Sequence, residues 1–198
     1  MSQSPKATRH IMRVRTVLAV YAALLLESAK VDFDPKGLLH GVYSLDAQKD
    51  GLQGIPPVSW EGLDSEYRAV AIKALLNQDE ISERISEFLD GWSFDRLPLV
   101  TRAILLVSYS ETVLVGVTPR PVSINEALVI LKQFGSPTET RYVNAVLERT
   151  LSKALGEESD YKGPGKVHVS SEDIEPEAEI LKEIQEGEIT LKAPSKEE

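Results

Sequence analysis

The chain has 198 residues and no cysteine, and its 31 acidic against 22 basic side chains give a formal net charge of −9. A hydrophobic content of 42% is sufficient for the core of one ordinary domain. The lack of cysteine excludes disulfides and thiolate chemistry, and no apolar run reaches the roughly 20 residues of a membrane helix. These properties suit a cytoplasmic protein, and no membrane association is expected.

The charge is unevenly distributed along the chain. Residues 157–198 hold 13 acidic side chains and 5 lysines, whereas the first 16 residues hold four basic side chains and no acid. Residues 101–156 hold six basic and four acidic side chains. Because phosphate recognition requires a local basic patch rather than a basic protein, the negative net charge does not exclude a nucleic-acid ligand.

The first predicted helix follows a lead of seven residues that we expect to be disordered. Thr8 is a suitable N-cap, and apolar residues recur at helical spacing from Ile11 to Leu25, which predicts a helix ending near Ser28. Residues 31–61 are rich in glycine, proline and aspartate, which indicates a long loop with room for one short helix.

Three further helices are predicted before the last helical pair. Asp64 is placed to cap a helix that runs to about Asn77, and Asp79 to cap another that runs to Leu89. The segment 97–114 is apolar on most sides, so its helix should lie at the centre of a bundle.

Residues 120–148 encode two helices and the turn between them. Ser123 and Glu126 have the spacing of a capping box, which would start the first of these helices. Gly135 stands where that helix would end, in the left-handed conformation that glycine adopts at low cost. A second capping box, with proline at the first helical position, consists of Ser136, Pro137 and Glu139.

These elements predict an all-α fold, a bundle of about seven helices in two packed halves over residues 8–156. Residues 157–198 are rich in glutamate and lysine and poor in aromatics, so we expect a disordered acidic tail. Within it, residues 175–186 could form a transient or docked helix. The tail could compete with RNA phosphates for a basic surface, or it could simply aid solubility.

Several blocks of sequence carry a resemblance to a known family. Ile-Asn-Glu-Ala (124–127), Lys-Gln-Phe-Gly (132–135) and Arg-Tyr-Val-Asn-Ala-Val-Leu-Glu-Arg (141–149) are similar to the C-terminal signature of the NusB transcription antitermination factors. Residues 92–111 resemble the segment of that family around its Arg-Ala-Ile-Leu core, and residues 9–21 resemble its arginine-rich first helix.

The resemblance implies a NusB-like fold and a role in antitermination during ribosomal RNA transcription. Members of the family bind a short single-stranded RNA element, boxA, jointly with ribosomal protein S10, within an RNA polymerase antitermination complex. Some relatives form homodimers, so a homodimer is possible. The RNA-binding positions that carry over to this chain are Arg9, Arg13, Tyr21, Lys132, Thr138, Arg141 and Tyr142. The candidates for the S10-facing side are Thr101 and Arg102.

The residues themselves favour RNA as a ligand. Arg9 and Arg13 are four positions apart and share a helix face. Tyr142 lies between the cations Arg141 and Arg149, and single-stranded RNA is held by rings that stack on bases and cations that contact phosphates. The alternatives are that the arginines are merely solvated and that Tyr142 is a half-buried rim residue. An acidic segment, 61–95, is available for a basic protein partner.

Three departures from the family pattern leave another function open. His10, Ile11 and Met12 interrupt the first-helix arginines, Leu106 stands where arginine is common, and Thr138 stands where an acid is common. These departures favour a weaker or altered RNA preference. The alternative is a helical protein–protein adaptor that has the same fold but has weakened or lost RNA binding.

No catalytic or metal-binding pattern is present in the sequence. The three histidines are isolated, and there is no P-loop, Gly-x-Gly-x-x-Gly or Gly-x-Ser-x-Gly motif. We therefore expect no enzyme activity, no cofactor and no metal site. Asn125 and Asn144 are predicted to bond backbone groups at helix ends, with RNA contact as the alternative.

Overall fold

The computed structural model describes residues 8–45, 55–56 and 58–170. Within these residues there are seven α-helices, which confirms the all-α prediction: α1 (Arg9–Ser28), α2 (Pro35–Ser44), α3 (Ser65–Leu76), α4 (Gln78–Ser86), α5 (Leu99–Tyr109), α6 (Arg120–Phe134) and α7 (Thr140–Leu155). Shorter elements are the 3₁₀ turns η1 (Phe94–Arg96) and η3 (Pro137–Glu139), the π-helical turn η2 (Ser110–Leu114), and the strands β1 (Leu89–Asp90) and β2 (Val167–His168). No described helix is long and apolar enough to span a bilayer.

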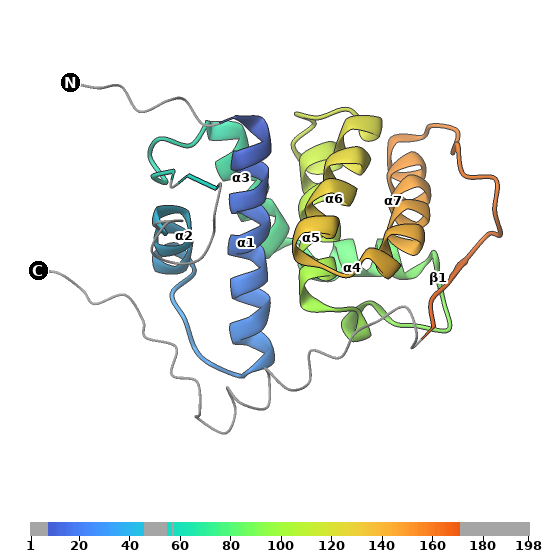
Figure 1. Ribbon diagram of the computed structural model, residues 1–198, viewed down its shortest axis with the longest axis horizontal. Coiled ribbons are helices and arrows are strands. Elements are labelled where there is room, and N and C mark those ends of the chain that lie inside the picture. Colours follow the sequence, from blue (N-terminus) through green and yellow to red (C-terminus); the bar gives the residue numbers. More distant parts are fainter. Residues whose placement is uncertain (1–7, 46–54, 57, 171–198) are drawn as a thin grey trace, which may run out of the picture.

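Helix α1 lies between the two halves of the molecule and contributes to both (Figure 1). On one side it packs with α2 and α3, and on the other with α5, around which α4, α6 and α7 are arranged. The smaller core includes Met12, Ala19, Leu39, Tyr43 and Tyr67. The larger core includes Val14, Val17, Ile104, Leu105, Val143 and Val146. The predicted division into two packed halves is confirmed, with α1 as a shared central helix.

The start of α1 agrees with the sequence prediction. The backbone N–H of Ile11 donates to Oγ1 of Thr8 at 3.3 Å, so Thr8 caps the helix. Because protein packs against α1 on several sides, its polar residues are not confined to an exposed stripe. Arg13 is 4% exposed and Arg15 is fully buried.

The middle of the chain also follows the predicted order with small shifts. The short helix in the loop 31–61 is α2, whose cap Asp34 accepts from the backbone of Lys36 and Gly37. Helix α4 begins at Gln78 rather than after Asp79, since α3 ends and α4 begins at the single residue Asn77.

The first predicted capping box is wrong. Helix α6 begins at Arg120, with Pro119 at the N-cap, so Ser123 lies inside the first turns of the helix. The Ser123 hydroxyl donates to the Ser108 carbonyl at 3.4 Å instead of capping the helix. Glu126 points across to α1. Both side chains therefore join elements that are distant in the sequence, which a local spacing rule does not reveal.

Gly135 ends α6 for a different reason from the predicted one. Its φ of −114° and ψ of −164° are extended, not left-handed. A Cβ atom at this position would lie 2.6 Å from Cδ1 and 3.1 Å from the carbonyl oxygen of Leu131, so any side chain here would crowd Leu131, and glycine avoids this contact. The chain then makes the turn η3, in which Ser136 Oγ accepts from the N–H of Thr138 at 3.4 Å, and α7 starts at Thr140 rather than at Pro137.

The segment after α7 is partly ordered, contrary to the prediction of a disordered tail from residue 157. Gly156 ends α7 with a φ of +68°. The chain then passes around α7 to β2, which pairs in parallel with β1 in the register Leu89 to Val167 (Figure 1). Val167 and Val169 are buried, with exposed fractions of 6% and 1%. The lead 1–7, the remaining tail 171–198 and the helix predicted at 175–186 lie outside the described residues.

Candidate nucleic-acid interface

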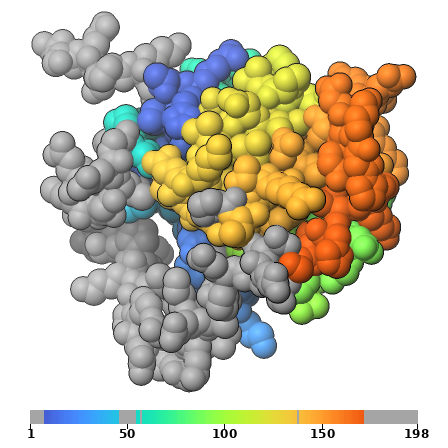
Figure 2. All heavy atoms as spheres, turned by 45° about the vertical axis from the view of Figure 1, so that its right-hand side comes forward, coloured from blue at the N-terminus to red at the C-terminus, as the bar shows by residue number. Residues whose placement is uncertain are grey.

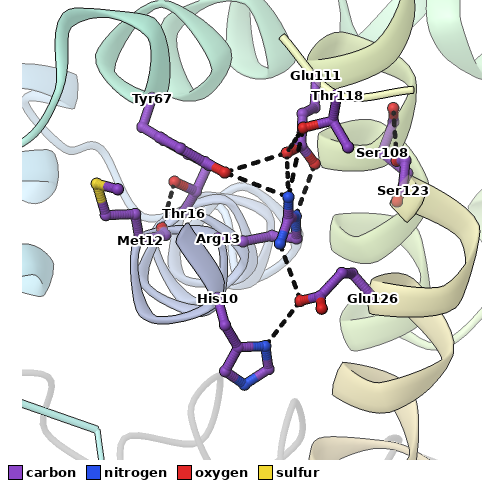
Figure 3. A network of polar contacts seen from close by, with 10 residues as sticks. All are labelled: His10, Met12, Arg13, Thr16, Tyr67, Ser108, Glu111, Thr118, Ser123 and Glu126. Atoms are coloured by element: carbon purple, nitrogen blue, oxygen red, sulfur yellow. Dashed lines mark hydrogen bonds and ion pairs between the residues drawn. The ribbon is translucent and has the colours of Figure 1, made fainter. Parts of the chain in front are cut away.

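Arg13, predicted to contact RNA, is instead the centre of a buried ion-pair network (Figure 3). Its Nε donates to Oε2 of Glu111 at 2.8 Å, its Nη2 contacts Oε1 of the same carboxylate, and its Nη1 donates to Oε2 of Glu126 at 2.9 Å. Glu111 is fully buried. The structure does not support the prediction that Arg13 binds RNA, because Glu111 accepts from Nε and Nη2 of its guanidinium and Glu126 accepts from Nη1.

Two neutral side chains complete the network around Glu111. The Tyr67 hydroxyl accepts from Arg13 at 3.2 Å and donates to Glu111 at 3.2 Å, and the Thr118 hydroxyl also donates to Glu111. Burial raises the pKa of Tyr67 to about 12, and the Glu111 charge acts in the same direction. Burial alone would lower the pKa of Arg13, but its hydrogen bond to Glu111 and their mutual attraction outweigh burial and raise it. The network therefore ties α1, α3, η2 and α6 together.

Glu126 receives a second partner from the start of α1. His10 Nδ1 lies 2.8 Å from Oε2 of Glu126, at the edge of the buried network (Figure 3). Partial burial would raise the pKa of Glu126, but the hydrogen bond from His10 and the charge of Arg13 outweigh it and lower the pKa. The start of α1 is thereby anchored to the first half of α6.

Arg15 is a structural residue as well. Its guanidinium donates to four backbone carbonyls, those of Val42, Leu45, Ile55 and Pro56, at 2.8 to 3.2 Å. Val42 and Leu45 lie at the end of α2, and Ile55 and Pro56 lie in the segment between α2 and α3. Of the three arginines in α1, only Arg9 is exposed.

The aromatic and partner-facing candidates are also placed differently from the prediction. Tyr142 is 3% exposed and belongs to the larger core, so the structure does not support its predicted stacking on an RNA base. Tyr21 is half-buried against the same core. Thr101 is fully buried and donates to Glu139, which excludes it from a partner surface. Arg102 makes an ordinary ion pair, with Nη2 3.4 Å from Asp95.

The remaining predicted residues are exposed: Arg9, Lys132, Thr138 and Arg141. They lie at the start of α1, near the end of α6, in η3 and at the start of α7. Figure 2 shows α6 in yellow and orange beside the start of α1 in blue. We call the set formed by these four residues with Asn125 and Val129 the α6 strip. Asn125, Val129 and Lys132 share a face at helical spacing, and Lys132 lies about 9 Å along the helix axis beyond Glu126, the anchor of α1.

The two asparagines do not serve as helix caps. Asn125 lies within α6 and Asn144 within α7, and both side chains are exposed. Neither makes a side-chain hydrogen bond to another described residue. Their predicted structural role is not supported, and both amides are accessible to a ligand.

A separate acidic surface covers α3 and α4. Residues 61–95 contain nine acidic and three basic side chains. Leu76, at the end of α3, is 78% exposed, and Ile72 one turn earlier is 41% exposed. Asp79 and Glu80 follow directly in the first turn of α4 and are exposed. This arrangement of exposed leucine and isoleucine next to carboxylates is suited to a basic protein surface.

Comparison with known proteins identifies the family. The sequence model of the NusB family matches residues 60–152. The transcription antitermination protein NusB of Bacillus licheniformis is 37% identical over 89 residues, which cover 45% of this chain and 69% of that protein. The NusB of Pseudothermotoga lettingae is 30% identical over 127 residues, covering 64% of this chain and 91% of that protein. The chain belongs to the NusB family.

Solved NusB structures share the fold. T. maritima NusB is 28% identical with a TM-score of 0.54, and the alignment covers 71% of this chain and 91% of that chain. A chain in the crystal structure of the antitermination factors NusB and NusE in complex with double-stranded RNA has a TM-score of 0.55, covering 73% of this chain and 96% of that one. At 18% identity, this second likeness shows the fold alone.

Sequence reasoning missed the partners of Arg13. Glu111 is a lone acid in an otherwise apolar stretch, and a carboxylate in such a helix is stable only with a cation. That pattern, with arginines flanking Val14 in another apolar helix, could have indicated a buried pair in this NusB chain. Among the described residues, no cluster of three or more histidine, aspartate or glutamate side chains is arranged to hold a metal ion.

Proposed function

We propose that this member of the NusB family binds a boxA-like single-stranded RNA together with ribosomal protein S10, as part of an RNA polymerase antitermination complex. Its curated relatives are transcription antitermination proteins, and the antitermination factors NusB and NusE (S10) have been crystallised together with double-stranded RNA. The observation that carries the proposal is the exposure of three cations and the Asn125 amide along the α6 strip.

The α6 strip would bind RNA mainly through phosphates. Arg9 at one end, with Lys132 and Arg141 at the other, supplies three exposed cations, and Asn125 can bond base edges between them. Because Tyr142 is buried, base stacking on α7 contributes nothing here. Affinity for RNA alone should therefore be modest, which gives the second protein a necessary role in stable binding.

The surface proposed for S10 is the acidic one on α3 and α4. Thr101 is buried, so the S10 contact is assigned instead to Leu76, Ile72 and the acids that follow them. The carboxylates would increase the rate at which a basic partner associates. Burial of the exposed leucine in the complex would increase the affinity.

Titration of labelled boxA RNA, with and without S10, tests this function. Replacing Lys132 and Arg141 by alanine should weaken RNA binding in both titrations. The matched control Lys73→Ala removes an exposed cation from α3 and should leave binding to RNA alone unchanged. RNA binding that is equal in the wild type and the double variant would exclude the α6 strip.

The protein–protein adaptor remains the second candidate, and one observation favours it. Arg13 and Arg15 are buried and bond internal acceptors, so α1 offers few cations to RNA. An adaptor would still form a complex with S10, and this complex would depend on Leu76. Calorimetry should therefore show weaker S10 binding by the Leu76→Asp variant than by the wild type. Binding of S10 without any salt-sensitive RNA binding would establish the adaptor and overturn the RNA proposal.

A further inference from the structure

A pocket of about 260 Å³ lies between the ends of α4 and α7. It is lined by Arg84, Glu87, Phe88, Tyr109, Thr150 and Lys153. Lys153 is twelve residues beyond Arg141 on α7, which is about 18 Å along the helix axis. The pocket is therefore separate from the α6 strip, and a ligand bound in it would not depend on RNA binding there.

Two cations of the pocket contact the same carboxylate, that of Glu87. Arg84 Nη1 lies 3.9 Å from Oε1 of Glu87, and the ammonium group of Lys153 contacts Oε2 of the same side chain. Glu87 follows the last residue of α4, and its side chain is 38% exposed. The Glu87 carboxylate therefore occupies a position between two cations that another anion could take. Because the Glu87 side chain is partly exposed, it can rotate out of this position when such an anion binds.

Two hydroxyl groups face the same space. Thr150 is 2% exposed, and its Oγ1 has no hydrogen-bond partner among the described residues. Tyr109 is 5% exposed and lines the pocket with it. A buried hydroxyl without a partner destabilises a protein, and this cost would be relieved by an acceptor placed in the pocket.

One of the two pocket cations, Lys153, contacts an aromatic ring of the pocket. The ammonium group of Lys153 lies 5.7 Å from the centroid of the Phe88 ring, and the guanidinium carbon of Arg149 lies 5.6 Å from the same centroid. Cation–π contacts of this kind orient charged side chains that would otherwise be mobile. Lys153 is therefore oriented before a ligand arrives, which lowers the entropic cost of binding.

We propose that this pocket binds a phosphate group, which takes the place of the Glu87 carboxylate between Arg84 and Lys153. Phosphate fits better than a carboxylate because it has more acceptor oxygens for the guanidinium, ammonium and two hydroxyl donors. The pocket is smaller than the sites of drug-sized ligands, so it admits a phosphate-sized group rather than a large molecule.

The test is calorimetric titration of the full chain with inorganic phosphate, compared with acetate, and, in a second arm, with AMP. Glu87→Gln removes the competing charge and should bind phosphate about tenfold more tightly, whereas Lys153→Met should bind about tenfold more weakly. Thr150→Val should weaken phosphate binding without lowering the thermal stability of the free protein, because it removes an unpaired hydroxyl. Lys132→Met, on the α6 strip, is the matched control and should leave phosphate binding unchanged.

The two arms distinguish the sources of the phosphate group. Tighter binding of AMP indicates a nucleotide, and equal binding indicates that the phosphate group alone is recognised. Three results would overturn the proposal: no saturable binding to the Glu87→Gln variant, shifts of the same sign in Glu87→Gln and Lys153→Met, or acetate binding as tightly as phosphate. Loss of RNA binding in the Lys132 variant with phosphate binding intact would show that the two sites are independent.

Discussion

Arg13 and Glu111 form a doubly hydrogen-bonded ion pair in the interior, although they are 98 positions apart in the chain. The pair joins α1, shared by the two halves, to the π-helical turn that follows α5. A buried charge is tolerated only when its partner is present, so each residue requires the other. Family resemblance associates the first-helix arginines with RNA, whereas here this arginine stabilises the junction on which the fold depends.

Replacing Arg13 by methionine should lower the free energy of unfolding by about 3–5 kcal/mol, because Glu111 would remain charged and buried without a partner. Urea unfolding measures this loss. The double variant Arg13→Met with Glu111→Leu should be more stable than the single variant, since it leaves neither charge of this pair. The folded fraction of Arg13→Met should keep the RNA affinity of the wild type, and a loss of RNA binding with full stability would contradict the structural role.

Stability should fall steeply at alkaline pH. Burial raises the pKa of Tyr67 from 10 to about 12. The contribution of Tyr67 to folding stability is therefore fully present below about pH 10 and is lost as pH rises through about 12. Burial also raises the pKa values of Tyr43 and Tyr109, which add to the same decline. Unfolding free energies measured across this range should decrease less steeply in Tyr67→Phe, and equal slopes would contradict the prediction.

Stability should also fall at acidic pH through Glu126. Its pKa is lowered overall by His10 and Arg13 despite partial burial. A lowered folded-state pKa gives stability that is present above the ordinary glutamate value and is lost as pH falls through the folded value. Glu126→Gln should therefore flatten the acid limb of the unfolding free energy measured against pH. An unchanged acid limb would show that this carboxylate is not coupled to folding.

The salt dependence of RNA binding should be shallow. Three phosphate contacts to a single strand predict a slope of about −2 for the logarithm of affinity against the logarithm of salt concentration. Replacing Arg9, Lys132 or Arg141 singly by alanine should reduce the slope by about 0.7 each. Filter binding at several salt concentrations measures it, with Lys73→Ala as the control expected to keep the wild-type slope. A slope unaffected by all three variants would place the RNA elsewhere.

Residues 167–170 should contribute to folding stability. A chain truncated after residue 166 loses the buried side chains of Val167 and Val169 and the pairing with β1, and should be about 1–3 kcal/mol less stable than the full chain. A chain truncated after residue 170 keeps these contacts and is the control. Chemical denaturation of both distinguishes them, and equal stabilities would show that β2 adds nothing.

Most of the helices could be predicted from the sequence because their signals are local. The apolar spacing in α1 and α7 and the cap at Thr8 depend on neighbours within a turn or two, and they apply whatever the rest of the chain does. The close approach at Gly135 is different. It depends on the exact packing of Leu131 in the turn, so the sequence indicates the end of a helix there but not the conformation of the glycine.

The candidate site could be predicted only where a residue lies on an outer surface. Lys132 and Arg141 are exposed, as periodicity indicates. Arg13 and Tyr142 are buried. The sequence periodicity of one helix does not indicate how many other helices pack around it. The prediction for segment 157–170 was wrong for a related reason, since its composition is polar and its partner β1 lies far back in the chain.

The helical class, the family and the positions of the exposed cations follow from short-range patterns that can be read along the chain. Packing in three dimensions establishes that Arg13 faces Glu111 and that Arg15 binds four carbonyls. It also places Glu87 between Arg84 and Lys153. The physical reason is that desolvation and ion pairing depend on which distant residues meet in space, and a side chain has the same local pattern whether it is buried or exposed.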